Sequence, residues 1–217
     1  MTLQLCFHGI GTIEQEREPG EARYWVTESV FLGILDRLTG HADVALSFDD
    51  GNRSDVDIAL PALTARGLDA TFFALAGRLQ DSRSLGGDDL RLLRTSGMRV
   101  GTHGWEHIPW RGLSENEAQR ELVDARDLLQ EVSGGGIDQA ALPLGRYDRQ
   151  LLRRLKRAKY RTVFTSDRFP ARDSAWLQAR YSVTATDTPG SVAALLDRRV
   201  GLGDAVQLGK SIVKRML

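Results

Sequence analysis

The chain has 217 residues, of which 41% are hydrophobic and 27% are charged. This composition is typical of one globular domain with a well-developed core, so we expect residues 1–217 to form a single domain. The 29 Lys and Arg residues balance the 29 Asp and Glu residues. No overall charge therefore attracts nucleic acid or an acidic polymer, and we expect no nucleic-acid partner.

The chain has one cysteine and no segment typical of export. A single cysteine excludes an internal disulfide. Cys6 lies in an apolar run, which favours a small core residue. The N-terminus lacks the charged start and long apolar stretch of a secretion signal, and no apolar run reaches transmembrane length. These features predict a cytoplasmic protein, although trimming of an export signal would leave the same sequence.

Apolar, β-rich segments alternate with helical patterns along the chain. The predicted strands are residues 3–7, 44–48, 70–75, 98–101, 140–142 and 161–165, and the predicted helices are 25–38, 54–66, 88–95, 114–132, 148–158 and 191–199. The helix at 114–132 is the clearest, because Ser114 and Glu117 match a capping box. The alternation predicts a parallel α/β fold, closed or nearly closed into a barrel, with functional residues at the carboxyl ends of the strands.

Two polar motifs follow predicted strands. Asp49 and Asp50 end the run Leu-Ser-Phe-Asp-Asp-Gly, and His103 and His107 lie about fifty residues later in Gly-Thr-His-Gly-Trp-Glu-His. Asp50 and the two histidines make a two-histidine, one-carboxylate metal set with open coordination positions. Asp49 is then a spare carboxylate that could serve as a base toward water, an arrangement typical of a hydrolase. Each motif alone also fits a solvated turn or a chance surface pair.

The motifs resemble those of a known family. Ser-Phe-Asp-Asp-Gly and Thr-His-Gly-Trp-Glu-His closely resemble the first two signature motifs of the polysaccharide deacetylases, the NodB-like group also called carbohydrate esterase family 4. Residues 141–148, Ala-Leu-Pro-Leu-Gly-Arg-Tyr-Asp, resemble a degenerate third motif. The resemblance runs from the first strand to about Arg180. It implies an α/β fold, namely the distorted (β/α)7 barrel of the NodB-homology type.

The resemblance also implies roles for individual residues. It implies that Asp50, His103 and His107 are the metal ligands and that Asp49 is the general base. The third motif of the family supplies a backbone N–H to the oxyanion, and the matching position is Leu144. A plain strand-to-helix turn is the alternative for this segment.

Two expected residues are missing from their usual positions. The third motif normally begins with an Arg that pairs with the base, but Ala141 stands there. We predict that Arg180 replaces it, with a surface arginine as the alternative. No histidine follows His107, so the general acid of the fifth motif is absent. His8 ends the first strand and resembles the acid histidine of the circularly permuted poly-N-acetylglucosamine deacetylases; the alternative is a hydrogen-bonded core histidine.

Aromatic residues near the motifs suggest a sugar-binding surface. Trp105 could stack on a pyranose ring, Tyr147 could line the pocket, and Pro143 fixes the backbone beside Leu144. Trp176, with Asp173, resembles the fourth motif at a spacing one residue short. Packing in the core is the alternative for the aromatic residues. We predict Trp105, Tyr147, Pro143 and Trp176 as substrate-binding residues.

The sequence therefore predicts a metal-dependent hydrolase that removes the N-acetyl group from an amino sugar or N-acetylated glycan and releases acetate. The expected cofactor is a divalent metal, zinc first, with cobalt, nickel or manganese as alternatives. A deformylase or another C–N hydrolase, and a non-catalytic carbohydrate-binding relative, are the competing hypotheses. The C-terminal residues 209–217 form a basic, partly apolar helix pattern, which fits either peripheral membrane contact or an ordinary docked end.

Overall fold

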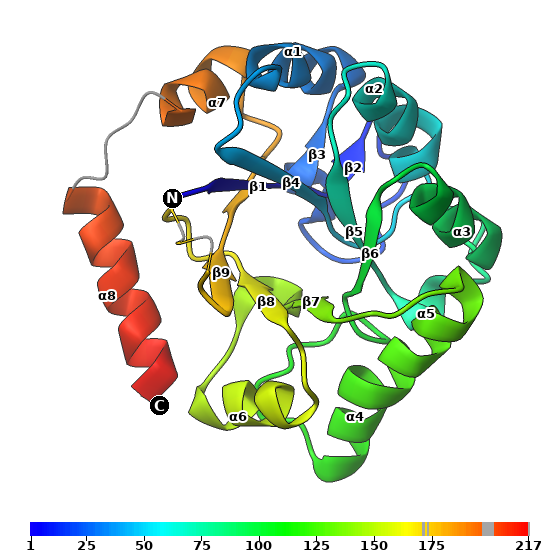
Figure 1. Cartoon of the computed structure of the whole chain (residues 1–217), viewed down its shortest axis with the longest axis vertical. Helices are drawn as coiled ribbons and strands as arrows, with labels where there is room; N and C mark the ends of the chain where they lie inside the picture. The colour runs from blue at the N-terminus through cyan, green and yellow to red at the C-terminus, as the bar shows by residue number, and fades with distance from the viewer. Residues whose placement is uncertain (171, 173, 197–201, 217) are drawn as a thin grey trace.

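The computed structural model describes residues 1–170, 172, 174–196 and 202–216. Within these residues, the strands form one parallel sheet that curves into a nearly closed barrel, with helices around its outside (Figure 1). This architecture confirms the predicted α/β fold and the distorted (β/α)7 barrel of the NodB type. No helix in the described ranges combines the length and apolar character needed to span a bilayer.

The main sheet has eight strands among the described residues, and every neighbouring pair is parallel. In sheet order they are β10 (Tyr181–Ser182), β1 (Leu3–Phe7), β4 (Val44–Phe48), β5 (Ala70–Ala74), β6 (Arg99–Thr102), β7 (Gln139–Ala141), β8 (Thr162–Thr165) and β9 (Leu177–Ala179). A separate parallel pair joins β2 (Gly9–Ile10) to β3 (Trp25–Val26).

The helices lie mostly between successive strands in the chain. The α-helices are α1 (Glu28–Leu38), α2 (Leu60–Thr64), α3 (Gly87–Thr95), α4 (Glu115–Gln119), α5 (Ala125–Ser133), α6 (Arg149–Arg157), α7 (Pro189–Leu196) and α8 (Leu202–Met216). The shorter 3-10 and π segments are η1 (Glu21–Tyr24), η2 (Asp55–Ala59), η3 (Ala76–Arg78), η4 (Arg120–Asp124) and η5 (Pro143–Gly145).

Most residues of the longer strands are buried, and the exceptions lie mainly at the beginnings of the strands. All five residues of β5 are buried, as expected for a parallel strand covered by helices outside and side chains inside. Phe48 stacks on Phe7 and on Phe72, with ring centroids 5.4 Å and 4.6 Å away. These rings lie in one continuous apolar cluster with α1 and α2, and this core holds the strand ends in fixed positions.

The barrel closes through a single residue. β9 pairs with β8 at one edge of the sheet, β10 pairs with β1 at the other, and only Arg180 separates the two strands along the chain. The Arg180 N–H donates to the Thr165 carbonyl, and the Val183 N–H donates to the Cys6 carbonyl. The chain thus changes neighbours at Arg180, and this step brings the two edges of the sheet together.

The first predicted helix begins later than expected. Trp25 belongs to β3, and α1 starts at Glu28 because the Thr27 hydroxyl accepts from the Val30 N–H as its N-cap. A Cβ at Gly9 would lie 2.0 Å from the Trp25 ring. Glycine at that position therefore lets the Trp25 side chain cover the backbone of β2. The prediction of helix from residue 25 was wrong for this reason.

The predicted helix at 114–132 forms as one continuous segment, α4–η4–α5, and its capping box is confirmed. The Ser114 hydroxyl accepts from the Glu117 N–H at 3.3 Å, and the Glu117 carboxylate accepts from the Ser114 N–H at 2.8 Å. The π segment η4 carries Glu121, which is buried. Residues 197–199 of the predicted helix 191–199 lie outside the described residues, and α7 covers the rest.

Candidate active site

A pocket of about 280 Å³ lies at the carboxyl ends of the barrel strands. Asp49 and Asp50 follow β4, His103 follows β6, and Arg180 follows β9. Parallel strands bring these residues to one end of the barrel although they are far apart in the sequence. The pocket lining also includes His8, His107, Glu18, Tyr24, Leu144 and Arg146.

Asp50, His103 and His107 face one another. The Asp50 Oδ1 atom lies 3.5 Å from His103 Nε2 and 3.3 Å from His107 Nε2. The Nδ1 atom of His103 is 2.9 Å from the Ala141 carbonyl oxygen. This contact places the Nδ1 proton toward the carbonyl and leaves Nε2 as the free lone pair. Burial lowers the pKa of His103 to about 4, so its ring is neutral at neutral pH.

The second histidine is oriented by a residue that the sequence analysis did not identify. Glu18 accepts a hydrogen bond from His107 Nδ1 at 2.7 Å, and Arg78 donates to the same carboxylate at 2.6 Å. A carboxylate behind a histidine fixes the ring and raises the basicity of its other nitrogen. Glu18 lies in a long loop 89 positions before His107, so no local pattern links the two.

The three side chains fit a divalent metal. Their candidate ligand atoms all lie within 4.8 Å of one another, and Asp50 Oδ1 is buried without a hydrogen-bond partner among the described residues. Asp50 and His107 also have positive backbone φ angles of 73° and 59°. Such conformations are unfavourable for residues other than glycine and are retained where the surrounding structure fixes them. An ion bridging these atoms would satisfy the buried Asp50 oxygen.

Asp49 is paired with Arg180. Arg180 Nη1 and Nη2 donate to the two oxygens of Asp49, each at 2.7 Å, and Nη1 also contacts the Ser47 hydroxyl at 3.0 Å. Both side chains are almost fully buried. The guanidinium lies over the rings of Phe73 and Phe164, 5.3 Å and 5.5 Å from their centroids. Arg180 is therefore a buried partner of Asp49, and its surface alternative is excluded.

The pairing controls the charge of Asp49. Burial alone would raise the pKa of this carboxyl, but the charge of Arg180, helped by His103 and by the direct hydrogen bonds, outweighs burial and holds the pKa below its usual range. Asp49 is consequently ionised at neutral pH. Its Oδ2 atom lies 3.9 Å from His103 Nε2, so the spare carboxylate borders the predicted metal set.

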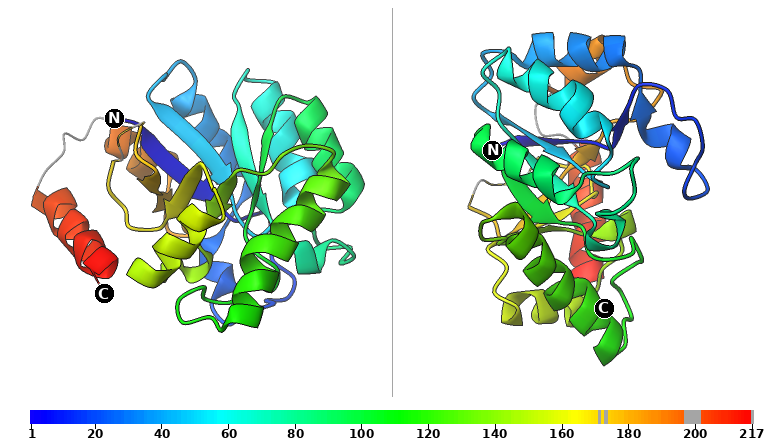
Figure 2. Two further views of the ribbon diagram at one scale, coloured as in Figure 1. Left: turned by 60° about the horizontal axis from the view of Figure 1, so that its bottom comes forward. Right: turned by 90° about the vertical axis from the view of Figure 1, so that its right-hand side faces the viewer.

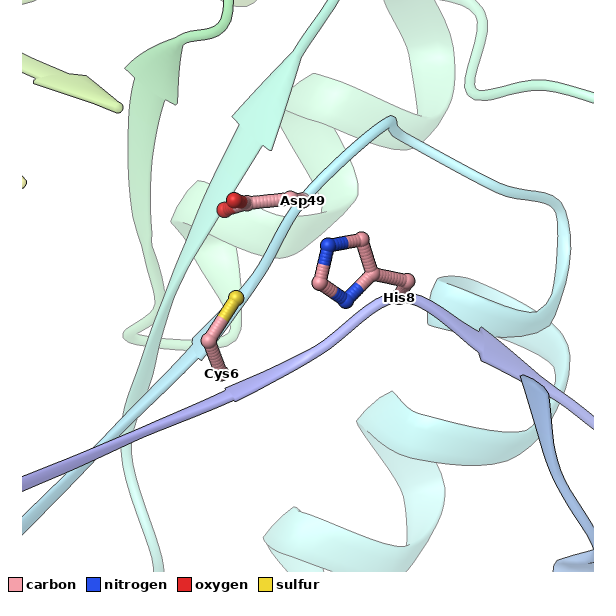
Figure 3. Close-up of side chains that lie close together, drawn as sticks. All are labelled: Cys6, His8 and Asp49. Atoms are coloured by element: carbon pink, nitrogen blue, oxygen red, sulfur yellow. The ribbon is translucent and has the colours of Figure 1, made fainter. Parts of the chain in front are cut away.

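His8 directly follows β1 and lines the pocket beside Asp49. Figure 3 shows the His8 ring and the Cys6 sulfur directed toward the same space as the Asp49 carboxylate, and ligand atoms of the three residues lie within 4.8 Å of one another. The His8 ring stacks on Tyr24 with centroids 4.7 Å apart, and its Nδ1 has no hydrogen-bond partner among the described residues. This position agrees with the location predicted for an acid histidine.

Cys6 lies close to His8 and Asp49, and its thiol is unreactive. Its side chain is buried, and its Sγ is 3.5 Å from the Phe7 carbonyl oxygen. Burial raises the pKa of the thiol well above its usual value, with Asp49 adding to the effect. Cys6 is therefore a neutral core residue, as the sequence indicated.

The third motif reaches the pocket through its backbone turn. Leu144 is 53% exposed, lines the pocket and has a positive φ of 56°. Gly145 follows with a positive φ of 61°, and a Cβ there would lie 2.1 Å from the Ser166 hydroxyl. Pro143 is buried and does not line the pocket, so its predicted substrate contact is replaced by a structural role in the turn.

The three aromatic residues predicted to bind substrate, Trp105, Tyr147 and Trp176, do not line this pocket. Each packs elsewhere in the protein, so this prediction was wrong. Trp105 packs against the main core with Arg120 over its ring. Tyr147 is buried, and its hydroxyl donates to Asp167 at 2.6 Å. Trp176 donates to the Tyr160 carbonyl at 2.8 Å and packs in the outer cluster around α6. Asp173 lies outside the described residues.

A buried glutamate holds the loop between the two histidines. Glu121 accepts hydrogen bonds from the N–H groups of Trp105 and Glu106 at 2.8 Å and 3.1 Å, and from the Trp110 indole at 3.1 Å. A Cβ at Gly104 would lie 2.3 Å from this carboxylate. Glu121 thus connects the π segment of the long helix to the loop that positions His103 and His107.

Comparisons with known proteins identify the family of the chain. The sequence profile of the polysaccharide deacetylase family matches residues 36–163, which is more than half of the chain. The chain therefore belongs to the polysaccharide deacetylase family. The curated relative YxkH of Bacillus subtilis strain 168, whose name refers to the same family, is 23% identical over 153 residues, covering 70% of this chain and 52% of YxkH.

A second curated relative, the peptidoglycan-N-acetylmuramic acid deacetylase PdaC of the same organism, is 36% identical over 93 residues. That match covers 42% of this chain and 19% of PdaC. The chain therefore aligns with about half of the length of one relative and less of the other. The family membership rests on the shared domain.

Solved structures show the same fold. Streptococcus pyogenes deacetylase PplD, solved in complex with acetate, superposes with a TM-score of 0.79 at 19% identity, covering 92% of this chain and 98% of PplD. IcaB from Ammonifex degensii superposes with a TM-score of 0.73 at 21% identity, covering 91% of this chain and 97% of IcaB. The architecture thus extends over nearly the whole domain of both proteins.

Proposed function

We propose that the protein is a metal-dependent hydrolase that removes the N-acetyl group from an amino sugar or an N-acetylated glycan and releases acetate. The observation that carries this proposal is the pairing, in one pocket, of an ionised Asp49 fixed by Arg180 with the Asp50, His103 and His107 set. Membership of the polysaccharide deacetylase family and the activity given by the name of PdaC support the same substrate class.

Asp50, His103 and His107 would hold the divalent ion, with zinc as the first candidate for this donor set. When bound, such an ion supplies a Lewis acid that polarises a carbonyl and lowers the pKa of water. Both histidines present Nε2 because Ala141 and Glu18 engage their Nδ1 atoms. The chain thus presents three prepared donor atoms from two separate loops.

Asp49 would accept a proton from the attacking water. Its two oxygens both receive hydrogen bonds from Arg180, so the carboxylate cannot rotate freely and keeps one edge toward the pocket. The backbone N–H of Leu144 is the proposed donor to the developing oxyanion. His8, which also lines the pocket, would give a proton to the departing sugar amine.

The test is release of acetate from a panel of N-acetylated sugar oligomers, peptidoglycan fragments, sugar nucleotides and glycolipids. We expect activity on at least one of them, loss of activity with a chelator and recovery with zinc. Asp49→Asn should retain metal and lose roughly 10²- to 10⁴-fold in rate. The control is Asp43→Asn, whose carboxylate is 72% exposed and should not alter the rate.

Two results would replace the proposal. Release of formate, or of another acyl group, in place of acetate would make the protein a different C–N hydrolase on the same residues. Sugar binding without any product, at full metal occupancy, would make it a non-catalytic carbohydrate-binding relative.

A further inference from the structure

Helix α8 faces the barrel with polar side chains. The Asp204 carboxylate accepts from the Tyr181 hydroxyl at 3.1 Å, and the Ser211 hydroxyl is 2.7 Å from the Tyr147 hydroxyl. Lys214 donates to Asp167 at 2.6 Å. Asp204 and Ser211 are buried. Hydrogen bonds and an ion pair therefore hold this helix in place, on the side where a surface helix normally buries apolar residues.

The opposite side of α8 is apolar and exposed. Among the described residues, five of the eight exposed large hydrophobic side chains lie on this helix: Val206, Leu208, Ile212, Val213 and Met216. Their spacings of three, four and seven residues place most of them on neighbouring turns of one face. Figures 1 and 2 show α8 at the outer edge of the molecule, with no other segment on its far side.

This arrangement requires an explanation, because exposed apolar patches usually mark interaction sites. Val206 and Val213 are 58% and 55% exposed, and Met216 is 73% exposed. Burying these side chains would contribute favourable free energy roughly in proportion to the apolar area removed from water. Leu208, which lies four residues after Asp204 and three before Ser211, is nearer the barrel-facing side. We call the surface formed by Val206, Ile212, Val213 and Met216 the apolar face of α8.

The charge of the surrounding chain identifies what would cover this face. Residues 146–217 contain 16 Lys and Arg against 6 Asp and Glu, whereas residues 1–145 contain 13 against 23. The balanced total therefore conceals a basic C-terminal third. Helix α6 packs against α8 and has four exposed cationic residues: Arg149, Arg153, Lys156 and Arg157.

We propose that the apolar face of α8 binds the surface of an anionic lipid membrane. An amphipathic helix lying in the interface buries its apolar side chains among the acyl chains, while adjacent cations meet lipid phosphates. Lys210 on α8 supplies one of those charges, and Arg149 and Lys156 on α6 supply others. Arg153 and Arg157 line a groove between α6 and the helical segment α4–η4 instead. A second copy of the chain fits less well, because a two-fold contact would bring two basic surfaces together.

The attachment would lie next to the pocket. Ser211 and Lys214 of α8 hold Tyr147 and its partner Asp167, and Arg146, the residue before Tyr147, lines the pocket. A membrane bound to α8 would therefore be near the segment that borders the active site. This inference is independent of the reaction proposed above, because binding to lipid can be measured without turnover.

The test is sedimentation of the full chain with vesicles of phosphatidylglycerol and phosphatidylcholine in equal parts, compared with pure phosphatidylcholine. We expect binding to the anionic vesicles alone, weakened by salt. Val206→Ser with Val213→Ser should weaken the partition by about tenfold or more. The control Leu92→Ser changes an apolar residue that is 48% exposed on α3 and should leave binding unchanged.

The contribution of the positive charges to membrane binding is tested with two double variants, one on α6 and one control. Arg149→Gln with Lys156→Gln should weaken binding roughly 25-fold, at about fivefold for each cation near the surface. Arg37→Gln with Arg83→Gln removes the same charge from the acidic part of the chain and should have little effect.

Three outcomes would overturn the proposal. The first is equal sedimentation with neutral and anionic vesicles, or none with either. The second is unchanged binding in the valine variant. The third is a concentration-dependent dimer, seen by sedimentation equilibrium, that the valine substitutions dissociate, since a second copy would then cover the apolar face of α8.

Discussion

Replacing Arg180 with methionine tests the Asp49–Arg180 pair most directly. Methionine has similar length and flexibility, so Arg180→Met keeps much of the contact with Phe73 and Phe164 while removing the charge. The variant leaves Asp49 buried without its cation, because Arg180 donates hydrogen bonds to both carboxylate oxygens.

The expected loss of stability is large. The Arg180 and Asp49 side chains are 2% and 5% exposed, so solvent cannot compensate the carboxylate that remains. Breaking such a buried pair by removing one partner costs about 3–5 kcal/mol in the free energy of unfolding. A surface pair gives the contrast: Arg161→Met removes the exposed partner of Asp138 and should cost less than about 1 kcal/mol.

The pH dependence follows from the sign of the pKa shift. In the wild type, the pKa of Asp49 is held below its unfolded value of about 3.8, so the stabilisation is fully present above that value and is lost as the pH falls further. In Arg180→Met, burial dominates and raises the pKa of Asp49 above its usual range. The stability deficit of the variant should therefore be largest near pH 7 and shrink as the pH falls toward 4.

The assay is urea unfolding in the presence of a chelator, from pH 7 to pH 4, combined with pH–rate profiles of the metal-loaded enzyme. The acidic limb of the rate profile should move upward in Arg180→Met. Asp49→Asn in the same background should recover much of the stability, because a neutral amide needs no cation. A folded variant with a deficit below about 1 kcal/mol and an unchanged acidic limb would refute the reasoning.

Three further predictions concern the residues around the proposed metal. His103→Ala with His107→Ala should abolish stoichiometric zinc in metal analysis, and retained binding would move the site elsewhere. Glu18→Gln should weaken zinc affinity about 10- to 100-fold in a chelator competition; a change below twofold would show that Glu18 does not support His107. His8→Ala should keep the metal and slow amide hydrolysis far more than hydrolysis of activated acetate esters, whose leaving groups need no proton. Equal losses would contradict an acid role.

The barrel and the metal set were predictable because their signals are local. The strands β1, β4 and β5 are apolar apart from one polar residue in each, Asp49 and Asp50 directly follow β4, and His103 directly follows β6. The short strands β9 and β10 carry too few residues for a periodic pattern, so they were not predicted. Their position depends on pairing with β8 and β1, which lie far away in the sequence.

The partners of the site residues could not be predicted either, because they also lie far away in the sequence. Glu18 contacts His107 across 89 positions, and only the folded barrel brings its loop to the pocket. The aromatic predictions were wrong for more than one reason. The Tyr147 hydroxyl bonds to Asp167 and Ser211 inside the protein, as a buried tyrosine usually does. Trp176 precedes β9, so it lies at the amino end of a parallel strand, away from the carboxyl ends that border the pocket.

Arg180 occupies the seam between β9 and β10, and this position links barrel closure to register. Side chains of an extended segment alternate between the two faces of a sheet. Deleting the one residue between Ala179 and Tyr181 removes the guanidinium itself. Inserting one residue between Ala179 and Arg180 would leave both short strands free to pair with β8 and β1, yet it would turn the Arg180 side chain from the interior to the outside. The length of this segment is thus constrained by the buried Asp49 carboxylate as well as by the sheet.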